Sequence, residues 1–469
     1  MEGVEDIPGA ALHEGLSWQW ESFGQYLDAV AERPHDMDIA AHLPHGALRV
    51  YVMGERGARL EAATPDDIAR MRALAGEAVR AGAIGFSTSR SLNHRSIKGE
   101  PTPGLRATEA ELTGIALGLR DAGRGVLQFI SDFDTPSLDE EFAMLRRVVA
   151  ASGRPMSFSL AQRHSSPHGY RKLLALVAQA QADGLPIRAQ VAPRPVGVLL
   201  SLQGSRNPFS SCPAYIAIAH RPLAERVVLL RQPALRAQLL HEINAVPATG
   251  VFRAQMMGWA RMFPMDDAPD YEPPADQALA AIAQREGKAP AEVALDWMLR
   301  NDGHGFLFSP FANYADYNLD ACREMLANPH TVVGLGDGGA HVSIISDGSF
   351  PTYLLTHWGR DRAEGRFDVA WLVKRQTLDT ARAVGLLDRG LLAPGYRADI
   401  NLIDFDRLAL AAPQMAYDLP ASGPRLLQRA SGYVATLVNG VPVYREGVPT
   451  GALPGRLVRG AQRAPLVAT

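Results

Sequence analysis

Cysteine is almost absent from this chain. Its 469 residues contain two, Cys212 and Cys322, which lie far apart and in no Cys-x-x-Cys pattern. This scarcity excludes a cysteine-rich zinc site and a disulfide framework. It also suits a reducing compartment, so we expect a cytoplasmic location.

Long apolar runs and an excess of one charge are missing as well. No stretch approaches the roughly 20 apolar residues that cross a membrane, and residues 1–8 are acidic without the apolar core of a secretory signal. The formal net charge is −3 and there is no long basic run. We therefore predict a globular protein that binds neither nucleic acid nor a membrane surface.

Short apolar segments that alternate with helical patterns are plentiful. Six segments have the length and composition of strands, at residues 38–43, 82–88, 125–131, 155–160, 186–191 and 331–336. Helical patterns lie between them, at residues 64–81, 107–122, 138–151 and 168–183. Such alternation indicates parallel β-α-β units, and we predict an α/β fold of the (β/α)8 TIM-barrel type.

Two regions depart from this alternation. Residues 198–328 are rich in helical patterns and are interpreted as an insertion between the last two strands, with one helix interrupted at Pro233. After residue 384 the pattern becomes β-type, with a hairpin turn at Asn439-Gly440. We expect a barrel over residues 1–384 and a small β-sandwich portion over residues 385–469.

The segment at residues 331–341 is the most informative part of the chain. A short apolar strand runs into Asp337, which glycines flank, and His341 follows in the same loop. In a barrel of alternating strands and helices, a polar residue at the carboxyl end of a strand is a candidate for catalysis. A glycine turn with a capping aspartate is the alternative interpretation.

Several short motifs carry a family resemblance. They are residues 336–338 (GDG), 350–353 (FPTY), 376–381 (QTLDTA), 385–399 (GLLDRGLLAPGYRAD) and 438–441 (VNGV). With them the chain resembles the amidohydrolase superfamily, and within it the N-acyl-D-amino-acid deacylase (D-aminoacylase-like) family, over essentially its whole length.

The resemblance implies hydrolysis of a non-peptide carbon–nitrogen bond. The expected substrate is a small molecule, an N-acyl-D-amino acid or a similar compound. The expected cofactor is a divalent metal, zinc, which activates water and polarises the carbonyl. By motif match, Asp337 is the catalytic aspartate that takes a proton from water and passes it to the leaving amine.

The metal ligands that this family uses are not found at the matching positions. No His-x-His occurs anywhere in the chain, and residues 129–132 (FISD) and 159–162 (SLAQ) contain no histidine where the family carries one. Asp132, Asp134 and Gln162 are the side chains there that could coordinate, and oxygen ligands suit zinc less well. The metal ligands are therefore left unassigned.

The first predicted strand falls near residue 38, and six strands are counted where the barrel needs eight. We expect that the first two strands are missing and that Met1 is an internal or misassigned start. Open parallel edges favour pairing with another chain, so homo-oligomerisation is an expectation.

Four further residues are candidates for binding the substrate. His341 lies in the Asp337 loop and Asp347 in the loop that follows it, while His45 and Arg90 follow predicted strands. Arginine grips carboxylates through two hydrogen bonds, which suits an amino-acid substrate. Two hypotheses follow: an active amidohydrolase, or a catalytically inactive fragment or pseudoenzyme with a binding or assembly role.

Overall fold

The computed structural model describes residues 1–133, 137–245 and 256–466. Its largest sheet is parallel throughout, in the order β1-β2-β3-β4-β5-β9. Its strands are β1 (His42–Pro44), β2 (Gly85–Arg90), β3 (Val126–Ser131), β4 (Met156–Ser159), β5 (Ile187–Val191) and β9 (Thr331–Val333). All six predicted strands are confirmed, although β9 ends at Val333, three residues earlier than predicted. Within the described ranges the sheet has six of the eight strands of a closed barrel.

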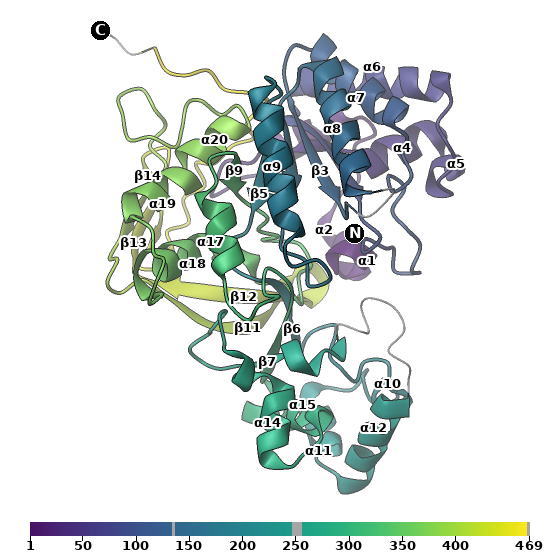
Figure 1. The fold of residues 1–469 in the computed structure, drawn as a ribbon, viewed down its shortest axis with the longest axis vertical. Coiled ribbons are helices and arrows are strands. Elements are labelled where there is room, and N and C mark those ends of the chain that lie inside the picture. The colour runs from purple at the N-terminus through teal and green to yellow at the C-terminus, as the bar shows by residue number, and fades with distance from the viewer. Residues whose placement is uncertain (134–136, 246–255, 467–469) are drawn as a thin grey trace.

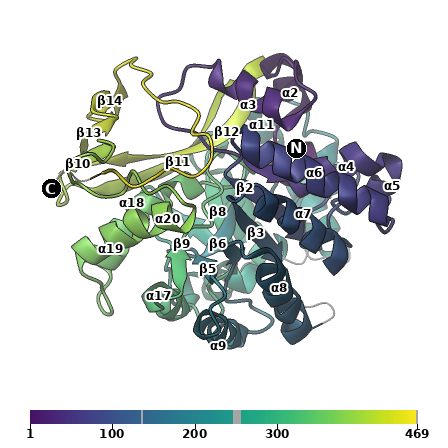
Figure 2. The ribbon, with the colours of Figure 1, turned by 90° about the horizontal axis from the view of Figure 1, so that it is seen from above.

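Helices connect these strands and form an arc around the outer face of the sheet (Figure 2). They are α4 (His45–Met53), α5 (Glu55–Ala58), α6 (Pro65–Ala81), α7 (Glu109–Asp121), α8 (Leu138–Ser152), α9 (Gly169–Ala182) and α17 (Asp320–Ala327). Three of them are capped by the residue before the helix, whose hydroxyl accepts a backbone N–H of the first turn: Thr64, Thr108 and Ser137.

The two faces of the sheet differ because side chains alternate along each strand. Phe86, Phe129 and Phe158 are at most 1% exposed and belong to the core shared with the outer helices. The intervening residues of the inner face are polar, and the Gln190 amide donates to Ser157 Oγ at 2.7 Å. A polar inner face leaves this side of the sheet available for a site.

The insertion between β5 and β9 forms a separate lobe at the bottom of Figure 1. Its three-stranded antiparallel sheet has the order β6-β8-β7, with β6 (Val196–Ser201), β7 (Phe263–Met265) and β8 (Phe306–Ala312). Its helices are α10 (Pro213–Ile216), α11 (Leu223–Leu230), α12 (Pro233–Ala245), α14 (Leu279–Glu286), α15 (Pro290–Met298), α16 (Arg300–Gly303), η1 (Trp259–Arg261) and η2 (Ala275–Gln277). The predicted interruption at Pro233 is confirmed, because α11 ends at Leu230 and α12 begins at Pro233. The three strands were not predicted.

After β9 the chain returns to helices and then to antiparallel strands. The helical segments are η3 (Asp347–Ser349), α18 (Phe350–Thr356), η4 (His357–Asp361), α19 (Val369–Gln376) and α20 (Leu378–Ala383). One sheet joins β10 (Ile400–Ile403), β13 (Tyr433–Val438), β14 (Val441–Arg445) and β15 (Val448–Pro449). The predicted hairpin is confirmed, with positive φ at both turn residues, 51° at Asn439 and 78° at Gly440.

A long hairpin lies between the barrel and the insertion (Figure 1). It consists of β11 (Ala409–Leu419), η5 (Pro420–Ser422) and β12 (Gly423–Ser431). At the other end of the chain, α1 (Glu2–Glu5), α2 (Gly9–Gly15) and α3 (Phe23–Ala31) precede β1. Among the described helices, none combines the length and apolarity needed to cross a membrane.

Candidate active site

The loop after β9 presents Asp337 at the carboxyl end of the parallel sheet. The Asp337 side chain is 50% exposed, and its Oδ2 lies 3.7 Å from His341 Nε2. Leu335 and His341 have φ of 64° and 48°, in the left-handed region that residues other than glycine rarely adopt. The chain therefore follows a tightly constrained path that leaves the carboxylate facing solvent.

Asp347 supports this loop from inside the protein. It is 3% exposed, and its Oδ2 accepts a hydrogen bond from the backbone N–H of Asp337 at 3.4 Å. Burial raises the pKa of Asp347 to about 6, although the Arg194 guanidinium, 3.4 Å away, acts in the opposite direction. Asp347 therefore contacts the backbone of Asp337 from the protein interior, and it does not face solvent as the Asp337 carboxylate does.

Arg194, which the sequence did not single out, holds Asp347 in place. It is 2% exposed, and its guanidinium lies 3.8 Å from the ring centroid of Tyr271 and 4.6 Å from that of Phe350. It follows β5 by three residues. Its position after a strand was a signal that could have identified it.

Two imidazoles and a second carboxylate surround Asp337. Burial lowers the pKa of His94, and the nearby His341 lowers it further, while Glu5, Asp132 and Asp337 oppose the shift. The shift favours the neutral form of the His94 imidazole, whose Nδ1 lies 2.7 Å from Ser89 Oγ. Glu5 Oε2 lies 3.8 Å from His341 Nε2. Nothing in the sequence signalled Glu5, because an acidic residue near a chain end is normally solvated.

Arg90 and His45, the other predicted binding residues, are engaged within the fold. The Arg90 guanidinium donates to both carboxylate oxygens of Glu141, at 2.7 and 3.2 Å. His45 is 2% exposed, with its Nδ1 2.7 Å from Thr88 Oγ1 and its Nε2 2.9 Å from Glu111 Oε1. Substrate binding by these two residues stays a prediction to which the geometry lends no support.

A metal-ligand cluster is not formed by the described part of the chain. Within residues 1–133, 137–245 and 256–466, no group of three or more His, Cys, Asp or Glu side chains could hold a metal ion. Asp132 accepts the Leu92 N–H at 2.7 Å, and the Gln162 amide donates to Asp316 at 2.8 Å. Asp134 lies outside the described residues. The described donor set therefore does not fit the zinc that the family resemblance implied.

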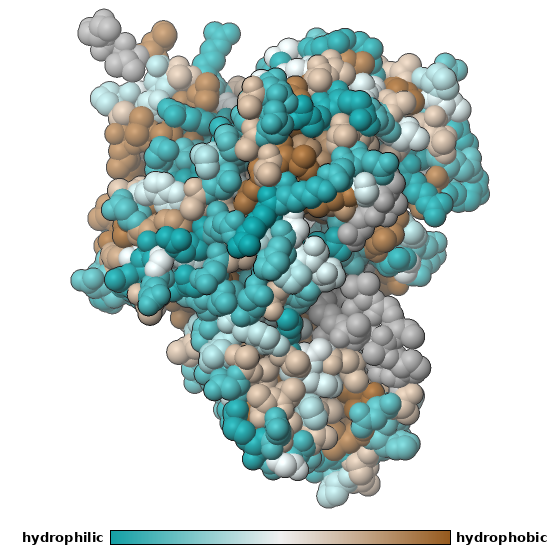
Figure 3. Space-filling model, viewed as in Figure 1, coloured by the Kyte–Doolittle hydropathy of each residue, from teal (hydrophilic) through white to brown (hydrophobic). Residues whose placement is uncertain are grey.

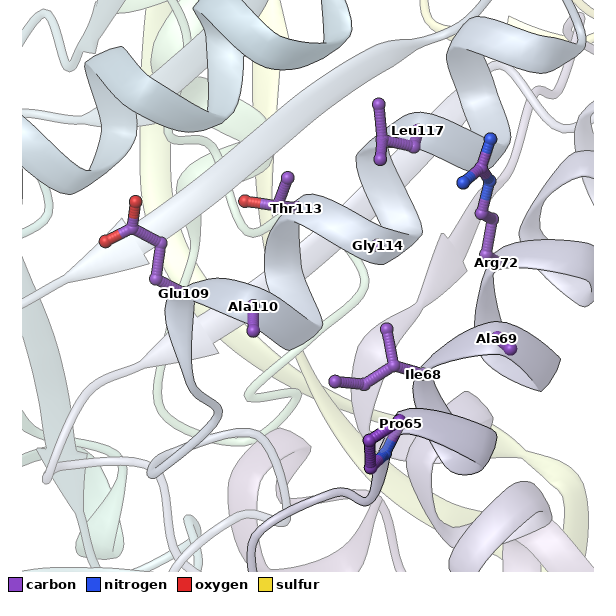
Figure 4. A pocket seen from close by; sticks show the side chains of 9 residues that line it. All are labelled: Pro65, Ile68, Ala69, Arg72, Glu109, Ala110, Thr113, Gly114 and Leu117. Atoms are coloured by element: carbon purple, nitrogen blue, oxygen red, sulfur yellow. The ribbon is translucent and has the colours of Figure 1, made fainter.

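Two pockets differ in how they lie relative to the candidate active site. A pocket of about 610 Å³ lies between α6 and α7 (Figure 4), but its Arg72 pairs with Asp121 and its Glu109 with Arg147. Another, of about 500 Å³, lies next to the Asp337 loop and is lined by Asp6, Ser205, Arg226 and Ser343, among others. The second pocket adjoins the candidate active site.

The sequence of this chain matches a known protein family and several of its relatives. The model of the amidohydrolase family matches residues 1–444. The D-aminoacylase of Alcaligenes xylosoxydans xylosoxydans is 26% identical over 467 residues, covering 95% of this chain and 75% of the relative. The N-acyl-D-glutamate deacylase of the same organism is 26% identical over 454 residues, covering 95% and 74%.

Solved structures agree with this chain in fold. The crystal structure of D-aminoacylase superposes with a TM-score of 0.58 at 22% identity, over 97% of this chain and 79% of the other. The N-acyl-D-glutamate deacylase from Bordetella bronchiseptica, solved with zinc and a phosphonate inhibitor, gives 0.56 at 21% identity, over 98% and 80%.

Proposed function

Because this chain belongs to the amidohydrolase family, we propose that it hydrolyses a non-peptide carbon–nitrogen bond, the amide of an N-acyl-D-amino acid or a similar compound. Two of its relatives, D-aminoacylase and N-acyl-D-glutamate deacylase, support this substrate class. The same relatives give no support to the alternative of a catalytically inactive binding protein.

The exposed carboxylate of Asp337 carries the proposal. It lies at the strand end where barrel enzymes place catalytic groups, and Asp347 fixes its backbone. In the proposed reaction Asp337 takes a proton from water while the water oxygen attacks the amide carbon. Asp337 then gives that proton to the leaving nitrogen, and the products are a free amine and a carboxylic acid, which releases its proton to solvent.

The imidazoles beside Asp337 have a complementary role. If Ser89 Oγ donates to His94 Nδ1, the neutral imidazole carries its N–H on Nε2 and can donate it to the carbonyl oxygen, on which negative charge develops as water attacks. We assign His94 and His341 to stabilising that charge and to orienting the substrate. The scheme uses the side chains of this chain alone, because the described residues do not offer the ligands of a zinc ion.

Replacing Asp337 with Asn tests the proposal. Loss of the proton carrier should lower kcat by roughly 10²–10⁴-fold on N-acyl-D-amino acids, with an unchanged melting temperature. Release of the free amine from D- and L-enantiomers measures both turnover and stereochemistry. The matched control is Asp302→Asn, an 83% exposed aspartate of the insertion, which should keep full activity. Retention of more than about a tenth of the activity by Asp337→Asn would contradict the role.

A further inference from the structure

The N-terminal turn lies against the candidate active site. The Val342 N–H donates to the Glu5 carbonyl at 3.1 Å, which ties α1 to the Asp337 loop. The turn fits closely, because a Cβ on Gly3 would lie 2.3 Å from the backbone N of Ile97. In Figure 1 the label N and α1 appear between the barrel and the insertion. Residues 2–6 therefore pack against the loop that carries Asp337 and His341, and Glu2 and Asp6 line the pocket beside it.

The carboxylate of Asp6 is bound there by two hydroxyl groups. Its Oδ2 accepts hydrogen bonds from Ser205 Oγ, at 2.7 Å, and from Ser343 Oγ. Ser205 belongs to the insertion, and Ser343, which is 2% exposed, belongs to the Asp337 loop. Asp6 is the C-cap of α1, and its φ of 53° lies in the left-handed region in which many helices end.

An arginine without an acidic partner lines the adjoining pocket of about 500 Å³. Arg226 Nη1 donates to the Leu202 carbonyl at 2.7 Å and to the Tyr215 hydroxyl at 3.1 Å. Its Nε is buried without a hydrogen-bond partner, and no described carboxylate forms an ion pair with it. A guanidinium held by neutral groups keeps its positive charge available to an anion.

We propose that Ser205 and Ser343 form a carboxylate subsite, which Asp6 occupies in place of the substrate carboxylate, and that Arg226, which Asp6 leaves unpaired, supplies a positive charge to the substrate carboxylate in the same pocket. The chemical class of the ligand rests on the proposed function, because an N-acyl amino acid carries one carboxylate besides its amide. Hydroxyl and guanidinium donors are the groups that such an anion takes. Ser343 is two residues from His341, so a ligand bound here lies along the same loop as the reacting group. The Asp6 side chain then competes with substrate.

The test compares variants of the acceptor, Asp6, with variants of the donors, which should change the Kd for the substrate in opposite directions. Binding of N-acetylalanine is measured by calorimetry in the intact chain carrying Asp337→Asn, which prevents turnover. Adding Asp6→Ala removes the competitor and should lower the Kd about fivefold to tenfold. Adding Ser205→Ala or Arg226→Gln removes a donor and should raise the Kd by about the same factor.

A neutral ligand supplies the control. N-acetylalaninamide has no carboxylate, so its Kd should change less than about twofold in all variants. An unchanged or weaker affinity for N-acetylalanine in Asp6→Ala, or equal responses of both ligands, would overturn the subsite. If Arg226→Gln fails to fold, Ser205→Ala, at an exposed residue, supplies the comparison. Binding is measured without turnover, so an inactive wild-type protein with the expected Kd pattern would refute the proposed function and leave the subsite standing.

Discussion

Asp347 illustrates at the scale of one residue how burial controls the active-site loop. In the unfolded chain its carboxyl ionises with a pKa of 3.8, and in the folded protein burial raises the pKa to about 6. Between these values the folded protein binds the proton and the unfolded chain does not. The free energy of unfolding contributed by this group therefore falls as pH rises from well below 4 to well above 6, by on the order of 3 kcal/mol in all.

Asp347→Asn should remove this pH dependence. As pH rises from 4 to 7, the wild type should lose about 2–3 kcal/mol of unfolding free energy relative to the variant. Urea unfolding at each pH measures it, and other titrating groups cancel in the difference. Parallel pH curves for the two proteins would show that the Asp347 carboxyl is not perturbed.

His45 lies in a buried charge network rather than in an open site. Glu111 is 0% exposed and pairs with both His45 and Arg49, whose side chain is also 0% exposed. Burial opposes ionisation of Glu111, yet the hydrogen bonds from His45 and Arg49 leave its pKa below the usual value. Such a network stabilises only while every charge has its partner.

Glu111→Gln should therefore destabilise the fold by about 3–5 kcal/mol, because it leaves the Arg49 charge buried without a counterion. The matched control is Glu109→Gln in the same helix. Its partner Arg147 is 59% exposed, and the loss should be below about 1 kcal/mol. Urea unfolding compares the two variants. Equal losses of unfolding free energy would mean that the buried pair contributes no more to stability than the exposed pair.

At the scale of the element, α6 and α7 pack closely because glycines lie at their contact, one of which, Gly114, is labelled in Figure 4. A Cβ on Gly114 would lie 2.3 Å from Ile68 Cγ2, and one on Gly118 would lie 2.3 Å from the backbone O of Arg72. Backbone cannot move aside as a flexible side chain can. Glycine at position 118 therefore sets the distance between the two helices.

Gly118→Ala should destabilise the protein by about 1–3 kcal/mol through this overlap. In Gly24→Ala the added Cβ meets only ordinary contacts, at 3.6 Å from Ala81 Cβ and 3.8 Å from Ser22 Oγ. That variant should be neutral or stabilising by up to about 1 kcal/mol, since alanine favours a helix more than glycine. Thermal unfolding of both variants measures the contrast, which would vanish if α6 and α7 could separate freely.

At the scale of the whole molecule, the described residues assemble no metal cluster. Prolonged treatment with a strong zinc chelator should then leave the melting temperature within about 1 °C, because the described residues provide no set of three ligands that would hold such an ion. The zinc-containing deacylase from Bordetella bronchiseptica is the positive control. A fall of several degrees in this protein would contradict the expectation.

Exposed apolar side chains on the C-terminal strands bear on self-association. Figure 3 shows apolar side chains gathered at the upper left. On the C-terminal strands β10, β14 and β15, Leu402, Val441 and Val448 are at least 40% exposed. Homo-oligomerisation stays a prediction.

The sequence by itself determined the parallel strands, the connecting helices and the place of Asp337. Each depends on neighbours within a few residues: the length of an apolar run, a capping hydroxyl, glycines after a strand. The Asn439-Gly440 turn was predictable for the same reason, because its backbone requires positive φ at both positions.

Only the tertiary structure decided which polar groups are exposed and which are buried. His45 is paired with Glu111, which is 66 residues away, and Asp6 with Ser343, which is 337 residues away. No local pattern encodes such pairs, because their energies depend on burial, and burial is set by how distant elements pack. The strands of the insertion were missed for a related reason, since their pairing partners β6 and β8 are separated by more than 100 residues.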